Sequence, residues 1–254
     1  MSRRFVRNIV LTGMVVFGLG GSVASRAELT IHSGWDLFIT DSSVTTFNYE
    51  PFQGVPLGTF DFGGTNQNVG DVDTIVYRPT NIVGPDGGGS TNFTANLVAW
   101  QLRSVNELNW GAGPGYYYLT LQSARGGPAS TDTGTMTFNS GGTNGTFTDT
   151  LDVFFDLRFG SLTGTIVMSN ECALWNYGAA WTRDGSYPPV ITNVNYLLNG
   201  SDTTEDFWPG RITHYGEGAD AGNIHSVPEP STMVLVCIGG IMGLWRIRRK
   251  LLRR

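Results

Sequence analysis

Lysine is missing from the central part of this 254-residue chain, and arginine is scarce there. Residues 28–226 contain six arginines and twenty acidic residues, hence a net charge of −14, whereas the whole chain carries −5. A nucleic-acid partner requires a basic face that neutralises phosphates. The charge balance therefore predicts no nucleic-acid binding, while it permits binding of divalent cations.

Cysteine is almost absent as well. Cys172 is the only thiol of the central region, and Cys237 lies in an apolar run near the end of the chain. The two cannot pair if one belongs to a folded body and the other to a membrane segment. The body is therefore expected to depend on its apolar core rather than on a disulfide. Cys172 is expected to be buried and inert, with intermolecular pairing or lipid attachment as alternatives.

Catalytic signatures are also lacking. There is no Gly-x-Ser-x-Gly, His-Glu-x-x-His or Cys-x-x-Cys motif, and the only lysine, Lys250, lies in the tail, which excludes a P-loop in the body. The histidines His32, His214 and His225 are isolated and lack zinc-ligand spacing. We expect His214 to be a structural or surface residue rather than a base. The sequence thus predicts no catalytic residues.

No segment of the body repeats at the helical period of 3.6, whereas several alternate with period two. In Thr150–Phe159 the apolar residues at odd positions share one face, and Asp152, Phe154, Asp156 and Arg158 share the other, which is typical of a half-buried strand. Asn96–Arg103 alternates likewise, with Val98, Trp100 and Leu102 facing inward. Further predicted strands are Trp35–Ile39, Leu57–Phe62, Asp73–Tyr77, Tyr116–Gln122, Gly134–Phe138, Thr163–Met168, Ile191–Leu197 and Ile212–Tyr215.

Turn signals separate these runs. Asn139–Gly142, Thr143–Gly145 and Pro85–Gly89 are rich in Asn-Gly and Asp-Gly steps, which supply the positive φ angles of tight turns. They predict a hairpin that joins Gly134–Phe138 to the segment from Thr146 onward. Many short strands at this spacing, without an internal repeat, predict an all-β fold of the β-sandwich or jelly-roll kind, with one body over residues 28–226.

Two features of the body are candidates for binding or chemistry. Asp202, Glu205 and Asp206 could hold Ca²⁺ through oxygen ligands or supply the paired carboxylates of a glycan-active enzyme; the same residues also suit a solvated loop. Asp71/Asp73 and Asp152/Asp156 are further acidic pairs, which we expect to be solvated.

The second feature is aromatic. The segment Leu174–Tyr187 is expected to be a loop, and its rings could stack on sugars as a ligand surface or plug the ends of the sandwich. The residues of this candidate surface are Trp175, Tyr177, Trp181, Tyr187 and Trp208.

Both ends of the chain have the composition of targeting segments. Arg3, Arg4 and Arg7 precede an apolar stretch and the small-x-small site Ser25–Ala27, the layout of a secretory signal peptide over residues 1–27. Cleavage is expected after Ala27, or alternatively after Ala24, following Sec export. A retained membrane anchor is the other interpretation.

The C-terminal segment, residues 227–254, has three parts in order. Val227, Pro228, Glu229 and Pro230 come first, and an uncharged apolar run extends to Trp245. As a helix, fifteen residues reach about 22 Å, a short span for a hydrocarbon core of about 30 Å. The basic end belongs on the cytoplasmic side. It comprises Arg246, Arg248, Arg249, Lys250, Arg253 and Arg254.

This order resembles the PEP-CTERM sorting signal of Gram-negative bacteria. The resemblance implies recognition and processing by an exosortase, a membrane-embedded protease, and deposition at the cell surface or in an extracellular polymer matrix. Segments such as Gly58–Gly64 and Val194–Gly200 are also similar to β-rich PEP-CTERM passengers. The leading hypothesis is an exported, non-enzymatic surface or matrix protein. A carbohydrate-binding module with a polysaccharide partner and a glycan-active enzyme are the alternatives, and an uncut tail anchor is the alternative for the C-terminus.

Overall fold

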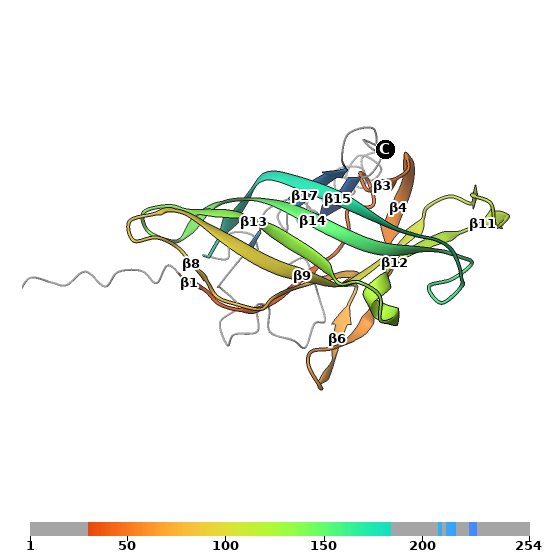
Figure 1. Cartoon of the computed structure of the whole chain (residues 1–254), viewed down its shortest axis with the longest axis horizontal. Coiled ribbons are helices and arrows are strands. Elements are labelled where there is room, and N and C mark those ends of the chain that lie inside the picture. The colour runs from red at the N-terminus through yellow and green to blue at the C-terminus, as the bar shows by residue number, and fades with distance from the viewer. Residues whose placement is uncertain (1–29, 184–207, 210–211, 217–223, 228–254) are drawn as a thin grey trace, which may run out of the picture.

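The computed structural model describes residues 30–183, 208–209, 212–216 and 224–227 (Figure 1). Within these ranges the chain forms eighteen strands and a single turn of 3-10 helix, η1 (Gln122–Arg125). The prediction of an all-β protein is therefore confirmed.

Most strands belong to one sheet of twelve, and the others form three small antiparallel pairs. The sheet contains β2 (Gly34–Phe38), β3 (Thr46–Phe47), β4 (Glu50–Gly54), β7 (Thr74–Arg78), β9 (Gly89–Ser104), β12 (Tyr117–Leu121), β13 (Ser130–Phe138), β14 (Asn144–Phe159), β15 (Thr165–Thr182), β16 (Trp208–Pro209), β17 (Ile212–Gly216) and β18 (Ile224–Val227). The pairs are β1 (Thr30–Ile31) with β8 (Ile82–Val83), β5 (Gly58–Asp61) with β6 (Asn66–Gly70), and β10 (Leu108–Asn109) with β11 (Pro114–Gly115).

The pairing of the large sheet returns to its starting strand. From β9 it passes through β13, β14, β15, β17, β18, β3 and β4, and β4 pairs with β9 again. The long strands β9, β13, β14 and β15 lie side by side in Figure 1. The last closing contact is small, because β18 meets β3 only where Ile224 pairs with Thr46. The sheet therefore wraps around its own interior.

The hairpin between β13 and β14 is confirmed, with Met136 opposite Phe147. The Asn139 side chain accepts a hydrogen bond from the Thr143 backbone amide at 2.9 Å and closes the turn. Asn144 and Gly145, which the sequence assigned to a turn, instead begin β14. Gly145 is needed there because a Cβ would overlap the Thr137 carbonyl oxygen.

The segment expected to be a loop, Leu174–Tyr187, is strand as far as Thr182. A β-bulge makes this strand hard to recognise in the sequence. Asn176 pairs with Asp149 and Ala179 pairs with Phe147, so Tyr177 and Gly178 together lie opposite Thr148. Gly178 carries the bulge with φ +73°. The inward face therefore changes from even to odd positions along β15, and period-two alternation is interrupted.

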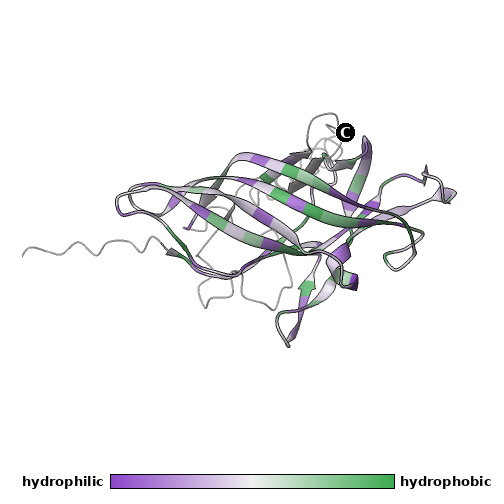
Figure 2. Ribbon diagram, viewed as in Figure 1, coloured by the Kyte–Doolittle hydropathy of each residue, from purple (hydrophilic) through white to green (hydrophobic). Residues whose placement is uncertain are grey.

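Two apolar clusters fill the interior, and a third packs on the opposite face of β2 and β7. The first surrounds Trp100, Tyr117 and Phe155, and the second surrounds Met136, Phe147 and Trp181. The third lies beneath β5 and β6. The predicted inward face of β14 is confirmed, since Leu151, Val153, Phe155 and Leu157 are all buried, and hydrophobic and hydrophilic residues alternate along the long strands in Figure 2.

The prediction that Val98 of β9 faces inward is wrong. Trp100 and Leu102 belong to the first cluster as predicted. Val98 instead packs on the third, because a bulge pairs Ala99 with Ile75 and Leu97 with Val76 and leaves Val98 between them.

Candidate functional site

A polar layer lies between the first two apolar clusters. Arg78 donates from Nε to Asp36 Oδ2 at 2.7 Å, and both side chains are buried. His214 Nε2 lies 3.0 Å from Asp149 Oδ1. A cavity of about 60 Å³ separates these two pairs, and residues of both apolar clusters line the rest of its wall. The buried charges of Arg78 and Asp36 are tolerated because they are paired.

The layer follows from strand register. Gly134, Asp149, Asn176 and His214 are successive partners across β13, β14, β15 and β17. Asn176 donates from Nδ2 to the Phe147 carbonyl at 3.0 Å. His214 is thus a buried hydrogen-bonding residue of the interior, in line with the structural role expected for it.

Asp132 faces the same cavity from β13. It is buried, and its Oδ1 has no hydrogen-bond partner. Burial, followed by the charges of Asp149 and Asp152, raises its pKa well above the usual range. A carboxyl in such a place is held in its neutral form.

A second hollow is open to solvent. This groove has a volume of about 450 Å³ and lies between the β3–β4 turn and β15. Phe155 and Leu157 of β14 form its floor, and Asn170 and Met168 stand opposite them on β15 and on the same side of the sheet. The other lining residues are Phe47, Asn48, Tyr49, Trp110, Val167, Glu171 and Cys172. Cys172, expected to be buried, is half-buried in this wall.

The rim of the groove has an unusual backbone. Phe47 pairs with Glu50, so the β3–β4 loop has two residues, Asn48 and Tyr49. Their φ angles are +49° and +66°, as in a type I′ turn, which accommodates Asn well and a bulky residue poorly. The Tyr49 side chain is nevertheless 69% exposed. The turn places the exposed Tyr49 at the rim of the groove at a cost of about 1 kcal/mol in backbone strain.

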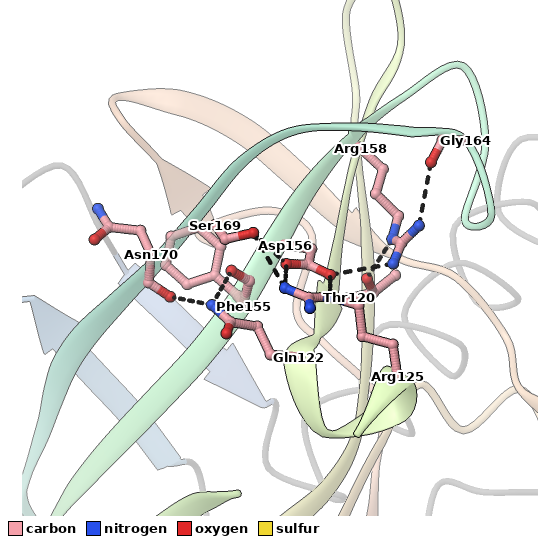
Figure 3. Close-up of polar contacts among 9 residues, drawn as sticks. All are labelled: Thr120, Gln122, Arg125, Phe155, Asp156, Arg158, Gly164, Ser169 and Asn170. Carbon is pink, nitrogen blue, oxygen red and sulfur yellow. Dashed lines mark hydrogen bonds and ion pairs between the residues drawn. The ribbon is translucent and has the colours of Figure 1, made fainter. Parts of the chain in front are cut away.

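An ion cluster surrounds the buried Asp156 carboxylate on the face of the sheet opposite the groove (Figure 3). The Asp156 carboxylate accepts two hydrogen bonds from Arg125, at 2.6 and 2.8 Å, and others from Ser169 and Arg158. Hydrogen bonding from Arg125 is the main reason why the pKa of Asp156 lies below the usual range. The pair Asp152/Asp156 was expected to be solvated; Asp152 is exposed, but Asp156 is fully buried.

Gln122, beside this cluster, ties the two strands beneath the groove together. Its Nε2 donates to the carbonyl of Phe155 at 3.0 Å and to that of Asn170 at 3.1 Å (Figure 3). The backbone that carries Asn170 into the groove is thereby fixed against β14. None of the sequence motifs indicated this arrangement, because its members come from distant segments.

The aromatic surface predicted from the sequence is only partly formed. Trp181 is 1% exposed and packs in the second cluster, so its assignment to a ligand surface is corrected. Tyr177 is 70% exposed, and its ring lies 6.4 Å from that of Tyr215. Trp175 is half-buried and pairs with Tyr215 across the strands. The backbone of Trp208 pairs with Thr182, and Tyr187 lies outside the described residues.

The other candidate residues also fall outside the described ranges. These are Asp202, Glu205 and Asp206, the sorting residues Pro228, Glu229 and Pro230, and the basic residues Arg246, Arg248, Arg249, Lys250, Arg253 and Arg254. Among the residues that the structure describes, no three His, Cys, Asp or Glu side chains are placed to hold a metal ion. The described part of the chain also contains no helix of sufficient length and apolarity to cross a membrane.

Comparison with known proteins assigns the C-terminal segment. Residues 226–250 match the family model of the PEP-CTERM protein-sorting motif. No curated protein and no solved structure matches the chain. The chain therefore carries the sorting motif of an exosortase substrate, which implies an exported protein that is processed at the membrane. Val227, the last residue of β18, lies within the matched segment.

Proposed function

We propose that this chain is a surface or extracellular-matrix protein whose body has a structural or interaction role without catalysis. The PEP-CTERM motif at residues 226–250 carries the proposal. Under this proposal, residues 1–27 are a signal peptide for Sec export, residues 28–226 are the body, and residues 227–254 are the sorting segment. A β-sandwich or jelly-roll-like architecture for the body belongs to the same proposal.

The tail supports a defined orientation before processing. The apolar run ending at Trp245 enters the membrane, and the basic residues after it stay in the cytoplasm. Pro228–Pro230 then lie on the outer side, within reach of a membrane-embedded protease. The body is anchored at the outer surface of the inner membrane until cleavage releases it to the cell surface or matrix.

The test compares the full chain with a variant that lacks residues 231–254, in the native host and in a strain without the exosortase. Intact mass would be measured in membrane, surface and medium fractions. We expect the full chain to end near Pro228–Pro230 at the surface, and only when the exosortase is present. A chain that still ends at Arg254 in the membrane, or a deletion that changes neither size nor location, would refute the sorting mechanism.

Carbohydrate binding is the second candidate function, favoured by the open groove with aromatic and amide side chains. The third, a glycan-active enzyme with or without Ca²⁺, rests only on Asp202, Glu205 and Asp206. Replacing these three with their amides would abolish turnover of a glycan by an enzyme but leave binding by a module unchanged.

A further inference from the structure

We propose that the groove between the β3–β4 turn and β15 binds one neutral sugar residue of a polysaccharide, with the ring of Tyr49 stacked on the sugar. The inference deepens the second candidate function and rests on it. It moves the binding site away from the aromatic residues that the sequence had suggested.

The size and the floor of the groove suit a ring-shaped ligand. Its volume of about 450 Å³ falls within the range of about 300–1,000 Å³ typical of small-molecule sites. The rings of Phe47 and Trp110 lie 6.0 Å apart, and that of Phe47 lies 5.2 Å from Phe155. Because these rings fix one another through edge contacts, little side-chain entropy remains to be lost on binding.

Tyr49 provides the stacking face. Its ring is exposed, whereas the other aromatic rings of the groove are partly or fully buried. The two-residue turn fixes the backbone that carries it. A flat, weakly polar ring presented in this way suits the C–H face of a pyranose. This stacking contact needs no hydrogen bond to the sugar.

The rim supplies groups for hydroxyls. Asn170 carries an amide that both donates and accepts hydrogen bonds, and Glu171 accepts them. A sugar hydroxyl also does both, so it complements each group. Gln122 donates a hydrogen bond to the backbone carbonyl of Asn170, which fixes the backbone from which this amide extends.

Charge selects among sugars. Among the described residues that line the groove, Glu171 is the only ionisable acid or base apart from the thiol of Cys172 and the phenol of Tyr49. No arginine or lysine lines the groove within the part of the chain that the structure describes, and residues 28–226 together have a net charge of −14 from six arginines and twenty acidic residues. An anionic uronic acid would meet repulsion from this carboxylate without a compensating cation. The groove therefore fits a neutral hexose residue.

The decisive experiment compares Tyr49→Ala with Tyr177→Ala. Tyr177 is a matched control, because it is the same residue type with the same exposure, 70% against 69%, and is absent from the lining of the groove. Binding of the full chain in detergent to soluble neutral glucan, mannan and galactan, and to polygalacturonate, would be measured by calorimetry. Unfolding midpoints would confirm that both variants fold.

We expect at least one neutral polymer to bind, Tyr49→Ala to weaken its association constant about tenfold, the size of one aromatic contact, and Tyr177→Ala to leave it unchanged. Asn170→Ala should also weaken binding, and polygalacturonate should not bind. The proposal is overturned if none of the neutral polymers binds, if Tyr177→Ala is the variant that loses binding, or if both variants bind as the unaltered chain does. Tyr49→Ala should still be sorted normally, so failure here is distinct from failure of the sorting mechanism.

Discussion

At the scale of single residues, the burial of certain carboxyl groups could not be predicted from the composition. Asp73 was expected to be solvated together with Asp71, but only Asp71 is exposed. The Asp73 carboxylate accepts hydrogen bonds from the Thr40 amide at 2.8 Å, from the Thr40 hydroxyl at 2.7 Å and from the Thr74 hydroxyl at 2.6 Å. Burial outweighs these bonds and raises the pKa of Asp73 to about 6.

This residue should make stability depend on pH. Because its pKa is raised in the folded state, the folded protein binds the proton more tightly than the unfolded chain does. The contribution of Asp73 to stability is therefore fully present below pH 3.8 and is lost as the pH rises through 6. At about 1.4 kcal/mol for each pKa unit, the loss is on the order of 3 kcal/mol.

The variant Asp73→Asn should lack that loss. We expect its unfolding free energy, measured by urea titration at pH 4 and pH 7.5, to fall less across this interval than that of the unaltered chain. The comparison cancels contributions from other groups such as Asp132, whose pKa is also raised. Parallel pH dependence in the two proteins would show that Asp73 does not titrate in this interval.

At the scale of elements, glycines decide where strands approach and where they bend. Gly145 lies beside Thr137, whose carbonyl oxygen also accepts a hydrogen bond from Trp181 Nε1 at 3.0 Å. A Cβ at position 145 would overlap that oxygen and approach the indole to 2.8 Å. Gly178, at the bulge of β15, has a positive φ but open space around its missing Cβ.

The two glycines should therefore respond differently to alanine. Gly145→Ala must push β14 away from β13 and weaken the contact of Trp181, at a cost of roughly 3 kcal/mol or more. Gly178→Ala adds only left-handed backbone strain, about 1 kcal/mol. Urea unfolding of both variants measures the difference, and equal costs would mean that β13 and β14 do not pack as closely as described.

Strand patterns were predictable from sequence only where pairing is regular. The inward face of Thr150–Phe159 was predicted correctly, because an uninterrupted strand on a buried core must alternate. The segment after Leu174 was mistaken for a loop, because its bulge changes the phase of the alternation. Only the partner strand determines where such a bulge lies.

At the scale of the whole molecule, the closing strand and the sorting motif adjoin. β18 completes the circuit of strands, and Val227 at its end pairs with Ile212 of β17. The matched sorting segment begins at Ser226, inside this strand. A protease acts most readily on chain that is free of such pairing, so the folded body should restrict access to the residues that follow directly.

Inserting eight Gly and Ser residues between Val227 and Pro228 should therefore speed processing. Pulse-chase labelling in the native host would follow conversion of the precursor to the mature mass. The same insertion between Ser140 and Gly141, in the exposed turn after β13, is the control and should leave the rate unchanged. If the insertion after Val227 has no effect or slows conversion, the closing strand does not limit access.

The sequence by itself determined the β class, the regular strand faces and the sorting segment, because alternation and a linear motif are properties of neighbouring residues. The tertiary structure decided which polar residues are buried and where the groove lies. Phe47, Trp110 and Asn170 are far apart in the chain, and only the closed circuit of strands brings them together around one hollow. Burial depends on contacts between distant segments, and these contacts cannot be predicted from a local sequence pattern.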